Sequence, residues 1–355
     1  MKLVSVNDLK GSEVLWKHIL DYEGKILLSA GTVLNEDHIN KLKHNGIYAI
    51  KVEENCDFNF KWKFKDDYMK TLKTSVIKNM PILFDNLVAG NYDDSHKYIE
   101  DVYSIVDHIM NQGTVNTNLF DLKHYDDYTY VHCVDTCIMA TFLGYTMNLN
   151  KSNLRHLAVA AILHDIGKTK VPSSIINKKG RLTNNEFEII KKHSLYGIQI
   201  LNSIKKFHPI VIRAVAEHHE KFDGTGYPFG IKGYRISKFA RIISICDVFT
   251  AVSANRSYRE RFNPTDAYEL ILSSSGTAFD PILVKHFRDT FYIYPLGCRL
   301  KLSNGLEGIV IKQNKSFPDR PIVRIISPGY NIYSNSFDMD LLKETAITVV
   351  QVFDD

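Results

Sequence analysis

One short segment decides the fold: Leu163-His164-Asp165-Ile166-Gly167-Lys168. It closes an apolar run over residues 157–163 that is typical of a buried helix. A carboxylate at the end of such a run must pair with a cation or bind a metal, because burying it alone is costly. Gly167 then lets the backbone turn. His164 and Asp165 are therefore candidate metal ligands, and the search for further ligands starts from them.

Other histidines and aspartates lie on separate apolar segments on both sides of this one. They are His132, His193, His218, His219 and Asp247. A lone histidine on an apolar helix is usually a satisfied core residue, but seven such donors together favour a metal site. Three or four ligands serve one ion. Seven predict at least two metals that share a bridging group, an arrangement suited to phosphoester cleavage.

The composition bounds the class of protein. With 355 residues, 45% of them apolar and 24% charged, the chain predicts two or three ordinary globular domains. The net charge of +4 is too small to indicate nucleic-acid binding. Because no apolar run approaches about 18 residues, we expect no membrane insertion. The first ten residues lack the apolar core of a signal peptide.

The cysteines are few and scattered. Five of them, without a secretion signal, indicate reduced thiols and a cytoplasmic protein. Cys133 and Cys137 lie beside His132 and invite a metal interpretation. Two small apolar side chains on a buried helix face are the favoured interpretation.

Three zones follow one another along the chain. The first, to about residue 60, predicts a strand at 25–28, a helix capped by Asn35 and ended by Gly46, and a strand at 48–52. A helical zone follows from about 64 to 290. It includes a capping box at Thr183-Asn184-Asn185-Glu186 and a polar stretch over 111–127, interpreted as a loop or linker.

Two more helices are expected in this zone. One begins at Pro209 and runs to His219, and the other begins at Pro264 and stops near Gly276. From about residue 295 the spacing of apolar residues becomes that typical of β-strands. Residues 299–302 and 307–311 flank Ser303-Asn304-Gly305, a hairpin signal, and strands are expected at 321–326 and 346–350.

The ligand pattern resembles the HD-GYP family of metal-dependent phosphohydrolases. His164-Asp165 is its HD pair, and the second signature runs from His218 to Pro228 and contains Gly226-Tyr227-Pro228. The resemblance covers roughly residues 120–290, with every main block in order. It implies a mainly α fold, an HD-type helical bundle with the metals at its centre, and cyclic dinucleotides, above all cyclic di-GMP, as substrates.

With this resemblance the domain prediction becomes specific. We expect a small N-terminal α/β module over residues 1–63 and a helical linker region over 64–117. The HD-GYP catalytic domain is expected over 118–292 and a small C-terminal β module over 293–355. The terminal modules are candidates for homodimer formation or for contacts with signalling partners.

The resemblance also assigns roles by position. His132, His164, Asp165 and Asp247 would hold one metal, and Asp165 would bridge to a second held by His193, His218 and His219. The family usually carries iron, with manganese as the alternative, and a histidine- and carboxylate-rich site fits either. A water between the two ions would be the nucleophile.

The substrate contacts are assigned in the same way. Lys168 matches the lysine thought to contact the scissile phosphate. Arg256 and Arg259 match basic positions that bind substrate phosphates, which suits the planar fork of arginine. Tyr227 would pack beside the metals or touch a guanine.

Three positions depart from the family pattern. Tyr128 stands where many relatives have a glutamate that helps to hold a third metal, so two metals are expected. Thr250 stands where a second aspartate often follows, and Ser257 where a proline is common. The last two bear on the geometry of the substrate loop, and neither removes a ligand.

The expected activity is hydrolysis of cyclic di-GMP to linear pGpG, with GMP as a further product. One alternative is an HD-type phosphohydrolase for another nucleotide, such as cyclic GMP-AMP. The other is a weakly active receptor that binds cyclic di-GMP and signals through its end modules. Catalysis would rest on Asp165 and Lys168.

Overall fold

The computed structural model describes most of the chain. The described residues are 2–6, 9, 13, 15, 19–20, 26–28, 32, 34–52, 67–112, 128–253, 264–326 and 337–353, apart from 179, 295 and 315. They divide into two compact units, one within residues 1–63 and one from residue 64 onward. None of the described helices is both long and apolar enough to cross a bilayer.

The first unit is a small α/β arrangement. Strand β1 (Lys2–Ser5) pairs antiparallel with β4 (Ala49–Val52), and β2 (Ile19–Leu20) pairs with β3 (Ile26–Leu28). Helix α1 (Glu36–His44) starts where predicted, because the Asn35 side chain accepts from the His38 amide. These elements enclose their own apolar core, which includes Leu15, Leu42 and Ile50.

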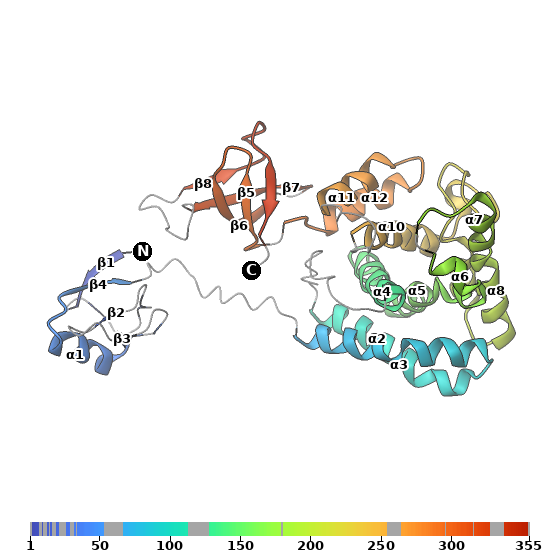
Figure 1. Cartoon of the computed structure of the whole chain (residues 1–355), viewed down its shortest axis with the longest axis horizontal. Helices are drawn as coiled ribbons and strands as arrows, with labels where there is room; N and C mark the ends of the chain where they lie inside the picture. The colour runs from blue at the N-terminus through green and yellow to red at the C-terminus, as the bar shows by residue number, and fades with distance from the viewer. Residues whose placement is uncertain are drawn as a thin grey trace. The chain divides into compact units, whose positions relative to one another are not determined.

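The second unit is built on helices, as predicted. Antiparallel helices α2 (Asp67–Val88) and α3 (Tyr92–Gln112) lie beside α4 (Tyr128–Thr146) and α5 (Lys151–Leu163), as Figure 1 shows. Helix α10 (Lys238–Ser253) packs on α4 and on α9 (Pro209–Glu217). Residues 157–163 of α5 are all buried, which explains their unbroken apolar run.

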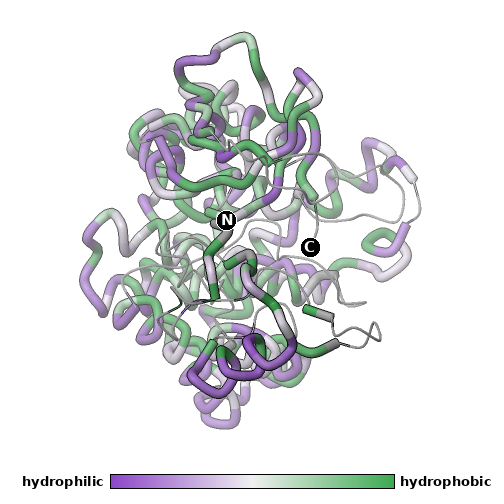
Figure 2. Tube along the Cα trace, turned by 90° about the vertical axis from the view of Figure 1, so that its left-hand side faces the viewer, coloured by the Kyte–Doolittle hydropathy of each residue, from purple (hydrophilic) through white to green (hydrophobic). Residues whose placement is uncertain are grey.

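Shorter elements surround these helices. They are η2 (Ile166–Lys170), α6 (Ser173–Ile176), α7 (Asn184–Lys191), α8 (His193–Ile204), η3 (Gly233–Arg235), α11 (Pro264–Ser273) and α12 (Pro281–Thr290). The predicted capping box of α7 is present, with Thr183 and Glu186 each bonding to the other's backbone amide. Hydrophilic residues gather on loops and outward turns along the trace in Figure 2. The apolar faces of the helices therefore form the core.

The C-terminal strands form one antiparallel sheet in the order β8-β7-β6-β5-β9. Its strands are β5 (Arg299–Leu302), β6 (Glu307–Asn314), β7 (Phe317–Ile326), β8 (Asp338–Asp340) and β9 (Val349–Val352). The predicted hairpin is confirmed: β5 pairs with β6, and Gly305 supplies the positive φ of +84° at the turn. Leu300, Val310 and Val323 belong to the same buried cluster as the helices.

Two details differ from the sequence-based expectation. The strand predicted at 346–350 begins at Val349, because residues 344–347 form a turn closed by the Ile347 amide and the Glu344 carbonyl. The helix from Pro209 ends at Glu217, and His218 is its C-cap. The fold class, mainly α with small modules of strands, is as predicted.

Candidate metal centre

Three of the candidate histidines stand at helix ends. His164 is the C-cap of α5, His218 is the C-cap of α9, and His193 lies at the junction of α7 and α8. His132 and Asp247 instead project from within α4 and α10. Because the chain changes direction at helix ends, these turns bring side chains from distant segments to one point.

The structure brings all seven predicted ligands together. Asp165, His193, His218 and His219 each offer a ligand atom, and these atoms lie within 4.8 Å of one another. His132, His164 and Asp247 form a second set by the same measure. All of these residues except His219 are buried. The two sets match the division expected from the sequence, and the ligand roles themselves stay a prediction.

Asp165 faces both sets. Its Oδ2 lies 3.4 Å from His164 Nε2, and its Oδ1 lies 3.6 Å from His193 Nε2. Each carboxylate oxygen of Asp165 therefore lies close to a histidine of a different set. A carboxylate in this position is able to bind two ions at once, which is the geometry of a bridging ligand.

The backbone fixes the tautomer of three histidines. His164, His193 and His218 each hold Nδ1 at 2.7 Å from the carbonyl oxygen three residues earlier. Carbonyls at a helix C-terminus have no partner within the helix, so they accept from the imidazole. A proton on Nδ1 leaves the Nε2 lone pair free for a metal.

His132 is oriented by Thr250, which the family pattern had connected only with the geometry of the substrate loop. Thr250 Oγ1 lies 3.1 Å from His132 Nδ1 and within 3.0 Å of the Cys246 and Asp247 carbonyl oxygens. The hydroxyl has one hydrogen, which it donates to a carbonyl, and it accepts from Nδ1–H. His132 Nε2 then faces Asp247 Oδ1 at 2.9 Å. A threonine in a helix often bonds to its own backbone, so the sequence offered no signal for this contact.

The electrostatics favour neutral histidines on one side and anionic carboxylates throughout. Burial lowers the pKa of His193, and burial together with neighbouring histidines lowers that of His218 further. Burial also lowers the pKa of His219, to about 3. Burial alone would raise the pKa of Asp165, but Lys168 and His164 outweigh it and hold that pKa well below its usual range. Neutral imidazoles and ionised carboxylates are the forms that bind metals.

The pKa of His164 is shifted in the opposite direction from the pKa values of the other three histidines. Burial lowers its pKa, but Asp165 and then Asp247 outweigh burial, so the net shift is upward. The carboxylates therefore favour positive charge at His164 Nε2. This atom and Asp165 Oδ1 are buried without a hydrogen-bond partner among the described residues. Two buried acceptor atoms without a partner fit a bound cation, which would satisfy both.

Lys168 lies beside the same carboxylate, on the turn that follows α5. Residues 166–170 form the 3-10 helix η2 rather than a continuation of α5. The Lys168 ammonium donates to Asp165 Oδ2 at 2.5 Å. Gly167 lets this turn press against α8, because a Cβ there would lie 1.9 Å from the His193 carbonyl oxygen. The turn thus places Lys168 at the edge of the centre.

Tyr227 closes the other edge. Its ring packs on His219 with centroids 4.8 Å apart, and its amide donates to the His219 carbonyl oxygen. Gly226 permits this close approach, since a Cβ would lie 2.3 Å from the Lys221 amide nitrogen. Burial, followed by Asp247 and Asp165, raises the pKa of the Tyr227 phenol. The phenol therefore stays protonated and is a hydrogen-bond donor near the carboxylates.

Helix α7 adds an exposed aromatic ring and a cation beside Tyr227. The Lys191 ammonium lies 5.4 Å from the Phe187 ring centroid and 5.8 Å from that of Tyr227. Phe187 is 47% exposed. The sequence pattern marks neither residue as functional, since Phe187 fits the apolar stripe of an ordinary amphipathic helix. The structure leaves its ring open to solvent.

Four positions singled out from the sequence lie outside the described residues or side chains. Arg256 and Arg259, the predicted phosphate contacts, lie outside the described residues, as does Ser257. Tyr128 begins α4, but its side chain is not among those described.

Cys133 lies near His164 and Asp165, where burial and Asp165 raise its thiol pKa well above the usual value. A thiol held neutral is a poor ligand and suits the core role expected for it.

Known proteins resemble this chain in the same region. The family described as HD domain matches residues 124–283. The chain is 36% identical over 197 residues to the cyclic di-GMP phosphodiesterase PA4108 of Pseudomonas aeruginosa, a match that covers 56% of this chain and 47% of that protein. It is 35% identical over 158 residues to the 3'3'-cGAMP-specific phosphodiesterase 2 of Vibrio cholerae, covering 44% of this chain and 30% of that protein.

A solved structure agrees on the fold. Bd1817, a protein from Bdellovibrio bacteriovorus described as HDG"Y"P, superposes with a TM-score of 0.53 at 17% identity. The match covers 81% of this chain and 97% of that one. At this identity the likeness shows the fold alone. The chain spans less than half the length of the two phosphodiesterases above.

Proposed function

Because the helical region of this chain belongs to the HD-GYP family, we propose that the protein is a metal-dependent phosphodiesterase that hydrolyses cyclic di-GMP. The observation that carries the proposal is Asp165, whose two oxygens face two separate sets of histidines with fixed tautomers. Such a centre suits a reaction in which a water attacks a phosphodiester while a charged oxygen leaves. When bound, two divalent ions supply an activated water and neutralise charge on the phosphoryl oxygens.

The residues of the chain would position the substrate around this centre. The Lys168 ammonium, held by Asp165, is placed to donate to a phosphoryl oxygen of the scissile bond. The protonated Tyr227 phenol offers a second donor, and its ring offers a face for a guanine. Arg256 and Arg259 would bind the phosphates of the ring by their position after Asp247.

We assign two ions per chain, most readily iron and alternatively manganese. Seven candidate ligands in two sets, with Asp165 of one set 3.4 Å from His164 of the other, match a binuclear centre. Tyr128 offers a phenol at the position that would support a third ion. A phenol of ordinary pKa near 10 must lose its proton to bind well, so it is a poor substitute for a carboxylate. Elemental analysis of anaerobically purified protein should therefore give two metals per chain.

The test of the proposed function is turnover of a nucleotide panel by metal-loaded, anaerobically purified protein. The panel holds cyclic di-GMP, 3'3'-cGAMP and linear pGpG, with products separated by chromatography. Cyclic di-GMP should be opened to pGpG fastest, and turnover of pGpG itself would show whether GMP is the end product. No turnover of any member with two metals bound would overturn the proposal.

Two sets of variants assign the roles. Asp165→Ala should abolish turnover and lower metal content at both positions, whereas Asp289→Ala, which removes an exposed carboxylate outside the centre, should change neither. Full metal content and normal turnover in Asp165→Ala would contradict the bridging role. Arg256→Ala and Arg259→Ala should each weaken cyclic di-GMP binding by about 1.5–3 kcal/mol, the worth of a charge-assisted hydrogen bond, and leave the metals in place.

Two other functions remain as alternatives. The similarity to a 3'3'-cGAMP-specific phosphodiesterase favours cyclic GMP-AMP as a second candidate substrate, and the panel separates it from cyclic di-GMP. A weakly active cyclic di-GMP receptor would bind the nucleotide tightly with little turnover. Homodimer formation or partner binding through the terminal modules stays a prediction.

A further inference from the structure

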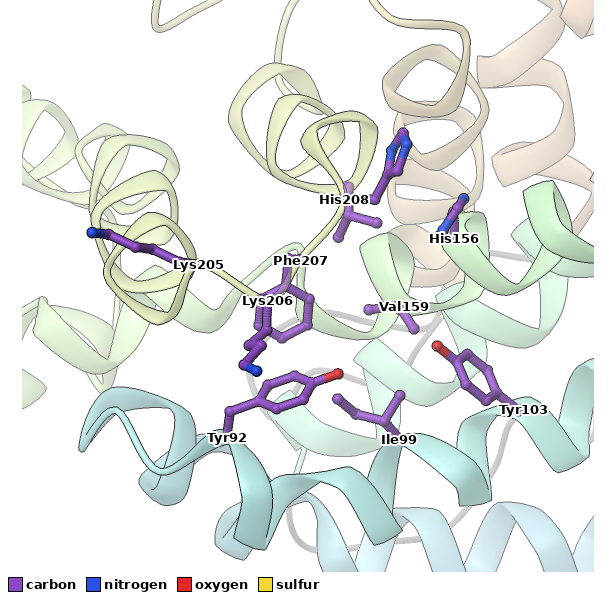
Figure 3. Close-up of a pocket in the computed structure, with 10 residues that line it drawn as sticks. Tyr92, Ile99, Tyr103, His156, Val159, Lys205, Lys206, Phe207 and His208 are labelled. Atoms are coloured by element: carbon purple, nitrogen blue, oxygen red, sulfur yellow. The ribbon is translucent and has the colours of Figure 1, made fainter.

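A cavity of about 330 Å³ lies away from the candidate metal centre, between α3, α5 and the segment that leads into α9 (Figure 3). It contains none of the predicted ligands or substrate contacts. Its volume lies at the lower end of the range for small-molecule sites. Three elements that are distant in sequence build its walls, so it is a feature of the folded chain and not of one loop.

Polar groups converge on this cavity. Tyr92 and Tyr103, both on α3, direct their hydroxyls toward its interior in Figure 3. Neither hydroxyl has a hydrogen bond to another residue of the described ranges. His156 Nδ1 is buried and also lacks a partner there. A buried polar atom is normally paired, so His156 Nδ1 indicates that a ligand or solvent completes it. The half-buried Tyr92 and Tyr103 offer two further hydroxyl groups to the same ligand.

The remaining wall is apolar and aromatic. Phe207 packs edge-on against Tyr92 with ring centroids 5.5 Å apart. His156 stacks on His208, with centroids 4.6 Å apart and planes 22° apart. Ile99 closes the floor. A planar, apolar group therefore finds matching surface inside the cavity.

The charge and proton positions favour a ligand rich in acceptors. Burial, then Glu100 and Asp93, raises the pKa of Tyr92, and burial raises that of Tyr103, so both phenols are donors at neutral pH. Lys206 adds an ammonium at the rim without an ion pair to any described residue. The Glu100 carboxylate, which contributes to the raised pKa of Tyr92, lies 3.8 Å from the Nε2 atom of the His96 imidazole. The amide of Ile210, in the first turn of α9, already donates to His208 Nδ1, so side chains supply the donors.

We propose that this cavity binds a small organic phosphate with a planar ring, such as a nucleoside monophosphate, at a site separate from the metal centre. Tyr92, Tyr103 and Lys206 would donate to the phosphate, and the ring would lie against Phe207 and Ile99. His156 and His164 are eight residues apart on one helix, which at 1.5 Å per residue is about 12 Å. The two sites are thus distinct but joined by α5.

The test is calorimetric titration of the full chain with GMP, ribose 5-phosphate and inorganic phosphate. In metal-loaded protein GMP should show two binding events, and only the cavity event should persist after chelation. Tyr103→Phe and Lys206→Ala should each weaken that event about tenfold, the loss expected for one hydrogen bond to a charged group. Tyr98→Phe is the matched control, because this half-buried tyrosine lies on the same helix outside the cavity.

Each other outcome counts against the site. Loss of all GMP binding on chelation would place the nucleotide at the metals alone. Equal affinity in wild type, Tyr103→Phe and Lys206→Ala would exclude these side chains as donors. Ribose 5-phosphate or inorganic phosphate binding as tightly as GMP would remove the need for a planar ring. The test does not depend on turnover, so it stands even if cyclic di-GMP is not the substrate.

Discussion

Thr250 shows how a single hydroxyl orients a candidate metal ligand. It accepts from His132 Nδ1 and is itself held by a backbone carbonyl one turn earlier, so the imidazole presents Nε2 to Asp247. Thr136 approaches the same hydroxyl at 2.9 Å. The contact is buried, so water cannot replace it if the hydroxyl is lost.

Thr250→Val should therefore weaken the metal held by His132. Removing a partner of this kind typically costs about 10–100-fold in metal affinity. Competition with a chelator of known affinity measures the effect directly, without any substrate. Thr250→Ser keeps the hydroxyl and should restore binding. Equal metal affinity in the valine and wild-type proteins would show that His132 needs no such support.

The candidate ligands could be predicted from the sequence for a physical reason. An aspartate such as Asp247 within the run 242–249 must find a partner, and seven such donors have few joint explanations. Thr250 and Phe187 carried no comparable cost in the sequence. A threonine is satisfied by its own helix, and an exposed phenylalanine fits an amphipathic pattern. Their surroundings become informative only in three dimensions.

At the scale of elements, Gly167 fixes how closely η2 approaches α8. A Cβ on this residue would lie 1.9 Å from the His193 carbonyl oxygen and 2.6 Å from the Gly197 nitrogen. Both are backbone atoms that cannot move aside. The loop that carries Asp165 and the helix that carries His193 are therefore held at one fixed separation.

Gly167→Ala should separate these two elements. We expect a loss of stability at or above the roughly 1–3 kcal/mol typical of overpacking, together with reduced metal content. Denaturant unfolding and elemental analysis measure the two effects. Gly144→Ala is a graded control, because its Cβ would meet only the ends of leucine side chains. A smaller loss there, with metals retained, is expected, and equal losses would contradict the argument.

Helix α7 depends on the capping box at its start. Lys178 and the Thr183 amide both donate to the Glu186 carboxylate, which lowers its pKa from 4.5 to about 2. The Glu186 carboxylate is thus harder to protonate in the folded state than in the unfolded state. The stabilisation is present above about pH 4.5 and is lost as the pH falls toward 2.

Glu186→Gln should remove this pH dependence. The free energy of unfolding of wild type should fall more steeply than that of the variant between pH 5 and pH 3, as measured by urea unfolding at each pH. The difference should be small and should shrink with salt, because the carboxylate is near the surface. Identical pH profiles would show that the box contributes nothing to stability.

Some elements could not be predicted from local pattern. Strand β8 reads Asp-Met-Asp, which has no strand propensity, and it forms because Ile322, Val323 and Arg324 of β7 offer an open edge. Residues 346–348 looked like strand, yet Arg320 donates to the Ile347 carbonyl and a turn holds the segment. Tertiary pairing overrides local preference in both places.

At the scale of the whole molecule, the first unit has its own core and supplies none of the candidate ligands. Its buried residues form a cluster separate from that of the helices. All seven predicted ligands lie between residues 132 and 247. We therefore expect the metal centre to form without the N-terminal unit.

A chain that starts at residue 64 should keep two metals and the thermal unfolding midpoint of the helical unit. Elemental analysis and calorimetry of this shortened chain provide the measurement. Loss of metals would mean that the N-terminal unit supports the centre directly. Retained metals with altered turnover would instead assign that unit a regulatory role.

The histidines anchored at helix ends also bear on how the protein acquires its ions. Their imidazoles are oriented by backbone carbonyls beside a large apolar core. We therefore expect ion uptake to be uncoupled from folding, unlike in small domains that fold around zinc. Nitrogen and carboxylate ligands also accept several transition metals. The ion found in the purified protein will thus reflect the supply at the time of loading, and exchange in vitro should need no unfolding step.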